Sequence, residues 1–267
     1  MSEAPDTGQE PELLYEVRNG VAWLTFNRPR TRNALTFAMY ARLEEICGTI
    51  ATDRSITALV ITGAGEKAFA AGTDIGQFRS FDSADDALAY ERHIDRVLTA
   101  LETCRVPTIA AISGSCTGGG AAIATCCDLR LGTRTAQFGY PIARTLGNCL
   151  SMSSIARLNA LIGPARVKDI IFTARLMGAD EAHGIGLLQE VAADHAALLD
   201  RADQLARLVS GHAPLTLRAT KEALRRLQEK DAGQDDRDLI LMCYMSKDFK
   251  EGIDAFLNKR RPNWRGE

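Results

Sequence analysis

The chain has 267 residues, of which 46% are hydrophobic and 25% are charged, with a formal net charge of −2. This composition is typical of a globular protein with a substantial core. The near-neutral charge excludes bulk electrostatic attraction to nucleic acid or to an anionic membrane, and no apolar run approaches the roughly 18 residues that span a bilayer.

The first residues predict a polar tail followed by a hairpin. The first basic residue is Arg18, and the segment before it lacks the features of a targeting peptide, so residues 1–11 are expected to be a disordered tail. Residues 13–17 and 21–29 are typical of strands, and Asn19-Gly20 between them is a strong hairpin turn signal. Seven scattered cysteines without a C-x-x-C pair indicate free thiols, so we expect a cytoplasmic protein.

Helices and strands alternate through the middle of the chain. Residues 34–53 predict a helix, because apolar side chains recur at helical spacing at Leu35, Met39, Leu43, Ile46 and Ile50. Buried strands are expected at 56–63 and 106–114, with a Gly/Ala-rich loop over 64–78 and a charged helix over 82–104. A small-residue helix after Gly120 and a strand over 128–133 complete an alternation that predicts an α/β or α+β layered fold.

The last third of the chain is mostly helical. Gly163-Pro164 predicts a helix stop and restart, and residues 187–193 predict a short strand. Three amphipathic helices are expected at 196–210, 213–230 and 237–257. We therefore expect residues 12–200 to form the core and residues 201–267 to form a helical region that packs on a neighbouring subunit.

Two glycine-containing segments, FAAGTDI (69–75) and GSCTGGGAAI (114–123), each follow a strand-like run and precede a possible helix. The missing side chains let a ligand approach the backbone, and N–H groups at a helix start attract developing negative charge. One N–H from each segment would form an oxyanion hole, a pair of donors that stabilises an enolate or a tetrahedral oxyanion. Small residues that only let a helix and a sheet pack closely are the simpler alternative, but two such segments favour the functional interpretation.

Other kinds of site find little support. The chain has no phosphate-binding G-x-x-x-x-G-K-[ST] loop, no G-x-G-x-x-G fingerprint with a downstream acid, and no G-x-S-x-G nucleophile motif. The four histidines are far apart in the sequence, so we expect no metal site.

Five stretches carry a resemblance to a known family, and two of them contain the glycine-containing segments: NRPRTRNAL (27–35), ALVITGAGEKAFAAGTDI (58–75), VPTIAAISGSCTGGGAAIATCCDLRLGTRTAQFGYP (106–141), ARLNALIGPARVKDIIFTARLMGADEAHGIGLLQEV (156–191) and EGIDAFLNKRRPNW (251–264). Through them the chain closely resembles the crotonase (enoyl-CoA hydratase/isomerase) superfamily. The resemblance runs from about residue 12 to the C-terminus. It implies a spiral of ββα units that forms two sheets, followed by C-terminal helices that build a homotrimer or homohexamer. It also implies an acyl-CoA thioester substrate, with coenzyme A as part of the substrate and no separate cofactor.

The resemblance also assigns site residues. It implies that Thr73 and Gly119 donate the two backbone N–H groups of the oxyanion hole. Asp74 matches a position common in the family, where we expect it to cap the following turn more than to act in catalysis. The resemblance further assigns nine residues to CoA binding, with Asp74 among them: Arg30, Thr31, Arg32, Ala70, Ala71, Gly72, Asp74, Phe256 and Lys259. Solvated surface charge is the alternative interpretation of Arg30, Arg32 and Lys259.

The resemblance to hydratases does not extend to the residues that transfer protons. Hydratases of this family hold the reacting water with two glutamates, and the corresponding residues here are Ala122 and Ile142. Water addition needs an acid and a base within hydrogen-bond reach, so hydration by the usual pair is not expected. Two other residues are candidates for the chemistry: Cys149 as a nucleophile and Arg144 as a carboxylate-binding group. The alternative interpretations are that Cys149 is a small buried side chain and that Arg144 is a surface or salt-bridged arginine.

The segment 76–96 supplies further candidates for an acid or a base, most of which we expect to be solvated helix charges: Asp82, Asp85, Asp86, Glu91 and His93. Two alternative functions therefore stay open beside the hydratase/isomerase assignment. One is a different reaction of the same fold, such as isomerisation, decarboxylation or thioester hydrolysis. The other is a non-catalytic acyl-CoA-binding protein.

Overall fold

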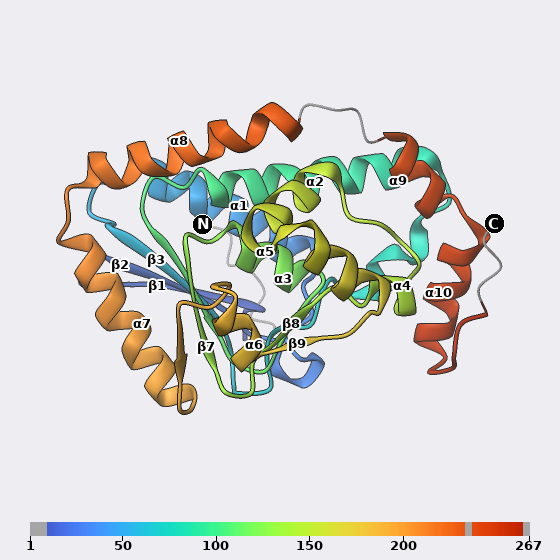
Figure 1. Cartoon of the computed structure of the whole chain (residues 1–267), viewed down its shortest axis with the longest axis horizontal. Coiled ribbons are helices and arrows are strands. Elements are labelled where there is room, and N and C mark those ends of the chain that lie inside the picture. The colour runs from blue at the N-terminus through green and yellow to red at the C-terminus, as the bar shows by residue number, and fades with distance from the viewer. Residues whose placement is uncertain (1–9, 233–236, 264–267) are drawn as a thin grey trace, which may run out of the picture.

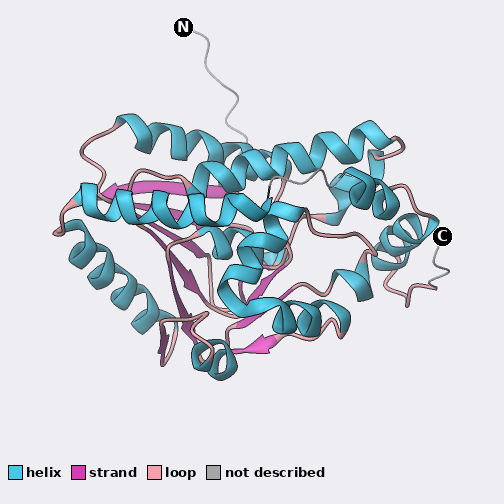
Figure 2. Ribbon diagram, turned by 45° about the horizontal axis from the view of Figure 1, so that its top comes forward, coloured by secondary structure: helices cyan, strands magenta, loops and turns pink. Residues whose placement is uncertain are grey.

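The computed structural model describes residues 10–232 and 237–263. Its strands form two sheets, and helices surround them (Figures 1 and 2). The larger sheet has six strands in the order β1-β2-β3-β5-β7-β10, parallel except for the antiparallel pair β1-β2. These strands are β1 (Leu13–Arg18), β2 (Val21–Phe26), β3 (Ala58–Gly63), β5 (Thr108–Ile112), β7 (Leu129–Thr133) and β10 (Glu190–Ala192).

The predicted hairpin is confirmed. β1 pairs with β2 in antiparallel register from Leu13↔Phe26 to Arg18↔Val21. Asn19 and Gly20, which connect the two strands, both have positive φ angles, 51° and 81°. Two positive φ angles in a two-residue turn match the twist of the flanking strands, which explains why Asn-Gly occupies this turn.

The smaller sheet has the order β4-β6-β8-β9, formed by β4 (Ala68–Ala70), β6 (Ser115–Thr117), β8 (Gln137–Gly139) and β9 (Met177–Gly178). The chain passes through a strand of the larger sheet, then a strand of this one, then a helix, in three turns: β3-β4-α2, β5-β6-α3 and β7-β8-α4. This is the expected spiral of ββα units. The expected loop over 64–78 is corrected, because it contains β4 and a 3₁₀ helix, η2 (Ile75–Ser80).

Three helices from the first half of the chain pack on the core beside these strands: α1 (Phe37–Thr52), α2 (Ala84–Glu102) and α3 (Gly119–Cys126). The Thr36 hydroxyl caps α1 by accepting a hydrogen bond from the Met39 amide, and Ser83 caps α2 in the same way through Asp86. The apolar positions predicted for the first helix are all buried: Leu35, Met39, Leu43, Ile46 and Ile50.

The helices in the middle of the chain stop and restart where the sequence predicts. α4 (Ile142–Thr145) precedes α5 (Met152–Phe172), which is interrupted at Gly163 with φ 76° just before Pro164, so the predicted stop and restart is confirmed. After α6 (Ala179–Gly184) and β10, α7 (His195–Ser210) packs its apolar side on the larger sheet against Val21, Val60 and Ile109. In Figure 1, α7 lies along this sheet at the left of the molecule.

The three C-terminal helices pack on other elements of the same chain. α8 (Pro214–Ala232) packs on α5, while α9 (Arg237–Tyr244) and α10 (Lys247–Leu257) pack on α2, η2 and α4 of the same chain (Figure 1). The single helix expected over 237–257 is corrected to two helices. They separate at Ser246, whose hydroxyl caps α10 by accepting a hydrogen bond from Phe249 N at 2.9 Å.

Residues 1–9 of the expected tail lie outside the described residues, whereas Pro11 O accepts a hydrogen bond from Asn27 Nδ2 at 3.1 Å. Within residues 10–232 and 237–263, none of the helices has the length and apolar character needed to cross a bilayer.

Candidate active site

The two glycine-containing segments meet in one cavity of about 550 Å³. Leu35 and Thr73 form an isolated parallel bridge, in which Leu35 N donates to Gly72 O and Asp74 N donates to Leu35 O, both at 2.8 Å. In a parallel bridge these flanking groups carry the hydrogen bonds, so the N–H of Thr73 itself faces away from Leu35. Thr73, Gly118 and Gly119 all line the cavity.

Each of the three adjacent glycines has its own physical reason. Gly118 has a φ of 52° and is the N-cap of α3, and its Cβ would lie 3.4 Å from the Cα of Gly72. A Cβ on Gly119 would lie 2.0 Å from the Tyr40 hydroxyl oxygen, and a Cβ on Gly120 would lie 2.3 Å from Ala70 O. Gly120 therefore serves helix–strand packing, whereas Gly118 and Gly119 bring bare backbone to the cavity.

Gly119 is the first residue of α3, so the helix offers no carbonyl to accept its N–H. The partial positive charge of the helix N-terminus adds to this donor. A Cβ built on Gly72, the residue before Thr73, would lie 3.9 Å from Gly119 N, so the two segments run next to each other. Thr73 and Gly119 thus lie on neighbouring segments of the cavity wall.

A chain of three hydroxyl groups supports this wall. The Tyr40 hydroxyl lies 2.9 Å from Thr73 Oγ1, which lies 3.1 Å from the Tyr90 hydroxyl. Desolvation raises the pKa of both tyrosines, and the charge of Glu91 raises both further, so both are neutral phenols at physiological pH. The three hydroxyl groups carry three hydrogens but make two hydrogen bonds with one another, so one hydroxyl hydrogen takes no part in these bonds.

The remaining wall is mostly apolar and aromatic. Ala122 and Ile142, 7% and 8% exposed, both line the cavity. Phe78 lines it as well, with the Tyr90 and Phe249 rings packed edge-to-face against it at centroid distances of 4.9 and 6.1 Å.

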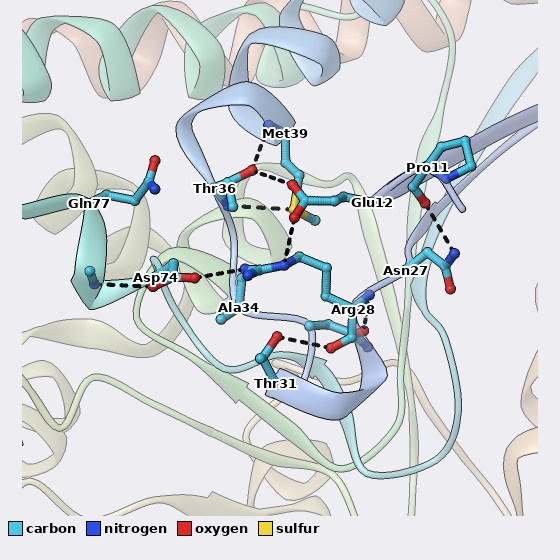
Figure 3. A network of polar contacts seen from close by, with 12 residues as sticks. Pro11, Glu12, Asn27, Arg28, Thr31, Ala34, Thr36, Met39, Asp74 and Gln77 are labelled. Atoms are coloured by element: carbon cyan, nitrogen blue, oxygen red, sulfur yellow. Dashed lines mark hydrogen bonds and ion pairs between the residues drawn. The ribbon is translucent and has the colours of Figure 1, made fainter. Parts of the chain in front are cut away.

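Two of the residues that line the cavity are acids, Asp74 and Glu91. Asp74 caps η2 by accepting a hydrogen bond from Gly76 N at 3.1 Å, as expected, and its other oxygen lies 2.9 Å from Arg28 Nη1 (Figure 3). Arg28 also pairs with Glu12 at 2.9 Å. The Asp74 carboxylate is therefore held in a network that fixes the local backbone.

Glu91 lies on α2 and accepts a hydrogen bond from the hydroxyl of Tyr244, which comes from α9. The same hydroxyl accepts a hydrogen bond from Asn148 Nδ2 at 3.4 Å. Among the acids suggested by segment 76–96, Asp82 and Asp85 are exposed and Asp86 caps α2. Of the candidates in that segment, Glu91 alone lines the described cavity.

The residues expected to bind CoA divide into two groups. Thr31, Arg32, Ala71, Gly72 and Phe256 line the cavity together with Asp74. Arg30 and Lys259 are exposed and lie outside its lining, and Ala70 is buried behind it.

Arg144 and Cys149 differ in their position relative to the cavity. Arg144 is exposed on α4 and does not line the cavity, whereas Cys149 lines it three residues before α5 begins. A hydrogen bond from the Cys149 thiol lowers the pKa of the Cys243 thiol to about 7. Within residues 10–232 and 237–263, no three His, Cys, Asp or Glu side chains come together as a metal site.

The tyrosines Tyr40, Tyr90 and Tyr244 were not predicted as site residues. Their hydroxyls come from three helices, so sequence spacing does not connect them. Glu91 did leave a signal in the sequence, because it stands at helical spacing within the buried stripe of α2, formed by Ala87, Leu88, Ile94 and Leu98. The spacing therefore indicates that Glu91 lies on the side of α2 that carries the buried apolar residues.

Comparison with known proteins agrees with this architecture. Residues 16–267 match the family model described as "Enoyl-CoA hydratase/isomerase". The chain is 32% identical over 252 residues to a short-chain-enoyl-CoA hydratase of Clostridium acetobutylicum, covering 93% of this chain and 95% of the relative. It is 34% identical over 258 residues to a 2,3-dehydroadipyl-CoA hydratase of Escherichia coli, covering 96% and 99%.

Solved structures share the fold. An enoyl-CoA hydratase/carnithine racemase from Magnetospirillum magneticum superposes with a TM-score of 0.77 at 34% identity, covering 97% of each chain. A methylmalonyl-CoA decarboxylase in complex with 2-nitronate-propionyl-CoA superposes with a TM-score of 0.86 at 29% identity, covering 97% of this chain and 100% of the other. The fold is thus that of the crotonase superfamily. The chain belongs to its enoyl-CoA hydratase/isomerase family, as the motifs predicted.

Proposed function

We propose that this protein binds an acyl-CoA thioester, directs the thioester oxygen at the backbone N–H groups of Thr73 and Gly119, and stabilises the enolate. The observation that carries this proposal is the convergence of two backbone donors on one cavity, one turned away from its bridge and one at a helix start. Removal of one such donor typically costs about 2.7–4 kcal/mol of transition-state stabilisation.

The CoA portion is proposed to run along Ala71 and Gly72 past Thr31 and Arg32, with Phe256 closing the cavity from α10. The position of these residues in the lining supports this path. Arg30 and Lys259 are proposed as phosphate partners beyond the cavity. No cofactor is proposed apart from the CoA of the substrate.

Water addition by two glutamates is not the proposed reaction, since the apolar Ala122 and Ile142 stand at the positions matched to them. We favour a reaction that needs only enolate formation, such as isomerisation or decarboxylation, over thioester hydrolysis. The apolar pair also favours a second candidate function, a non-catalytic acyl-CoA-binding protein.

Hydration of crotonyl-CoA, followed by loss of enoyl-thioester absorbance, tests this assignment. The unaltered protein is expected to turn over more slowly than about 10⁻² s⁻¹, a thousandth of an ordinary kcat. The double variant Ala122→Glu/Ile142→Glu is expected to gain at least about 100-fold, because it restores an acid and a base to the wall. Ala122→Gln/Ile142→Gln is the matched control, and rapid hydration by the unaltered protein would contradict the assignment.

The assembly is proposed to be a homotrimer or homohexamer built through the C-terminal helices. Large exposed apolar side chains support this, with Leu224 and Leu227 on α8 being 56% and 67% exposed and Phe172 at the end of α5 being 77% exposed. A cytoplasmic location is also proposed, on the ground that all seven cysteines are free thiols.

A further inference from the structure

Glu91 is a carboxylate in an apolar wall. Leu88 and Ile94, three residues before and after it, are both buried, so Glu91 projects from the side of α2 that faces the interior. It lines the same cavity as Thr73 and Gly119. Glu91 is half-buried there, and a carboxylate that is partly removed from water is stabilised by a hydrogen-bond partner.

The turn of α2 that carries Glu91 is fixed to the oxyanion-hole segment. Tyr90, the preceding residue, lies 3.1 Å from Thr73 Oγ1 through its hydroxyl. The negative charge of Glu91 raises the pKa of Tyr40, after the larger effect of desolvation, and the Tyr40 oxygen stands beside Gly119. The carboxylate is thus within electrostatic reach of the two backbone donors.

The other carboxylate, thiol and phenol groups in the lining are less suited to accept a proton. Asp74 is paired with Arg28 and caps η2. Cys149 pairs with Cys243. Tyr40, Tyr90 and Tyr244 all have raised pKa values, chiefly through desolvation, so none of them is a ready base.

We propose that Glu91 is the catalytic base that removes the α-proton of the bound acyl-CoA, and that Tyr244 is a positioning residue that holds its carboxylate. This inference rests on the proposed function. The α-carbon–hydrogen bond breaks, the proton moves to a carboxylate oxygen of Glu91, and the electron pair forms the enolate, whose charge rests on the thioester oxygen. The proton on the Glu91 carboxyl group exchanges with solvent, and return of a proton from this group to the α-carbon or to a conjugated carbon completes the cycle without addition of water to the substrate.

The proposed base comes from α2 and its positioning hydroxyl from α9. The cavity therefore draws its acid–base group from α2 and not from the helices that carry Ala122 and Ile142, and α9 becomes part of the site. Tyr244 donates to one carboxylate oxygen, which restrains the orientation of the Glu91 side chain.

Exchange of the α-hydrogens of butyryl-CoA in D₂O, measured by mass spectrometry, tests the proposal, because it reports proton removal whatever the complete reaction. Glu91→Gln is expected to lower the exchange rate at least about 100-fold, with butyryl-CoA affinity by calorimetry within about threefold of the unaltered protein. Asp85→Asn, an exposed acid in the first turn of the same helix, is the matched control and is expected to exchange at the unaltered rate.

Two further variants separate a catalytic role from a structural one. Sodium formate is expected to restore exchange to Glu91→Ala, while sodium chloride is not, since only a carboxylate can replace the base. Tyr244→Phe is expected to lower exchange about tenfold without a change in affinity. Thermal unfolding followed by circular dichroism verifies that each variant is folded.

The outcomes are distinct. Exchange within threefold of the unaltered rate in folded Glu91→Gln, or exchange absent from unaltered protein that binds butyryl-CoA, would overturn the role of Glu91. Unaltered protein that does not bind butyryl-CoA at millimolar concentration would instead overturn the proposed function itself.

Discussion

Gly119→Ala is expected to lower the α-hydrogen exchange rate of butyryl-CoA about 10²–10³-fold, the range typical for loss of one oxyanion-hole donor. The added Cβ would lie 2.0 Å from the Tyr40 hydroxyl oxygen, a distance that neither group can accept. Relief of this clash must displace the N-terminus of α3 or the Tyr40 ring. Movement of α3 shifts the Gly119 N–H away from the position of the thioester oxygen, and movement of the Tyr40 ring breaks its hydrogen bond to Thr73, the residue of the other donor.

The identity of the clashing atom makes this prediction specific. In the double variant Tyr40→Phe/Gly119→Ala the hydroxyl is gone, and the nearest remaining atoms would lie at 3.1 Å (Thr73 Oγ1) and 3.3 Å (Tyr40 Cζ). Exchange is expected to recover at least about tenfold relative to Gly119→Ala, a coupling of about 1.4 kcal/mol or more. Tyr40→Phe alone supplies the reference, and simple additivity of the two single changes would refute the proposed clash.

Gly120→Ala is expected to reduce stability rather than chemistry. Its Cβ would lie 2.3 Å from Ala70 O and 2.7 Å from Ala70 Cβ, so α3 would have to move away from β4. We expect a loss of about 3 kcal/mol in the free energy of unfolding, at the upper end of the usual range for overpacking. Urea denaturation followed by circular dichroism measures this loss.

Gly48→Ala is the matched control for Gly120→Ala. Gly48 lies in α1, is exposed, and has no atom within 4 Å of an added Cβ. The free energy of unfolding is therefore expected to rise by about 0.5–1 kcal/mol, because alanine loses less backbone entropy than glycine in a helix. Equal effects of the two changes would show that close packing of α3 on β4 does not explain Gly120.

Local signals predicted much of the fold. The Asn19-Gly20 turn, the apolar stripe from Leu35 to Ile50 and the break at Gly163-Pro164 each depend on residues close together in the sequence, and each is confirmed. The short strands β4, β6 and β8 could not be predicted from the local sequence pattern. Three residues are too few for alternation to appear, and the partners of these strands, including β9 beside β8, lie far away in the sequence.

The part of the candidate site that consists of backbone groups could be predicted from the sequence. Thr73 and Gly119 stand in segments whose small residues are visible in the sequence, and both line one cavity. The side-chain partners were not predictable, because Tyr40, Tyr90 and Tyr244 come from α1, α2 and α9 and meet only in the folded chain. Glu91 was one acid among several until the cavity distinguished it.

The most direct test of the oxyanion hole is a crystal structure of the protein with a bound, unreactive acyl-CoA analogue that retains its carbonyl oxygen. The carbonyl oxygen is expected within about 2.7–3.1 Å of both Thr73 N and Gly119 N, the range for donors aimed at an oxyanion. A bound analogue whose carbonyl oxygen lies away from both nitrogen atoms would contradict the assignment of these residues.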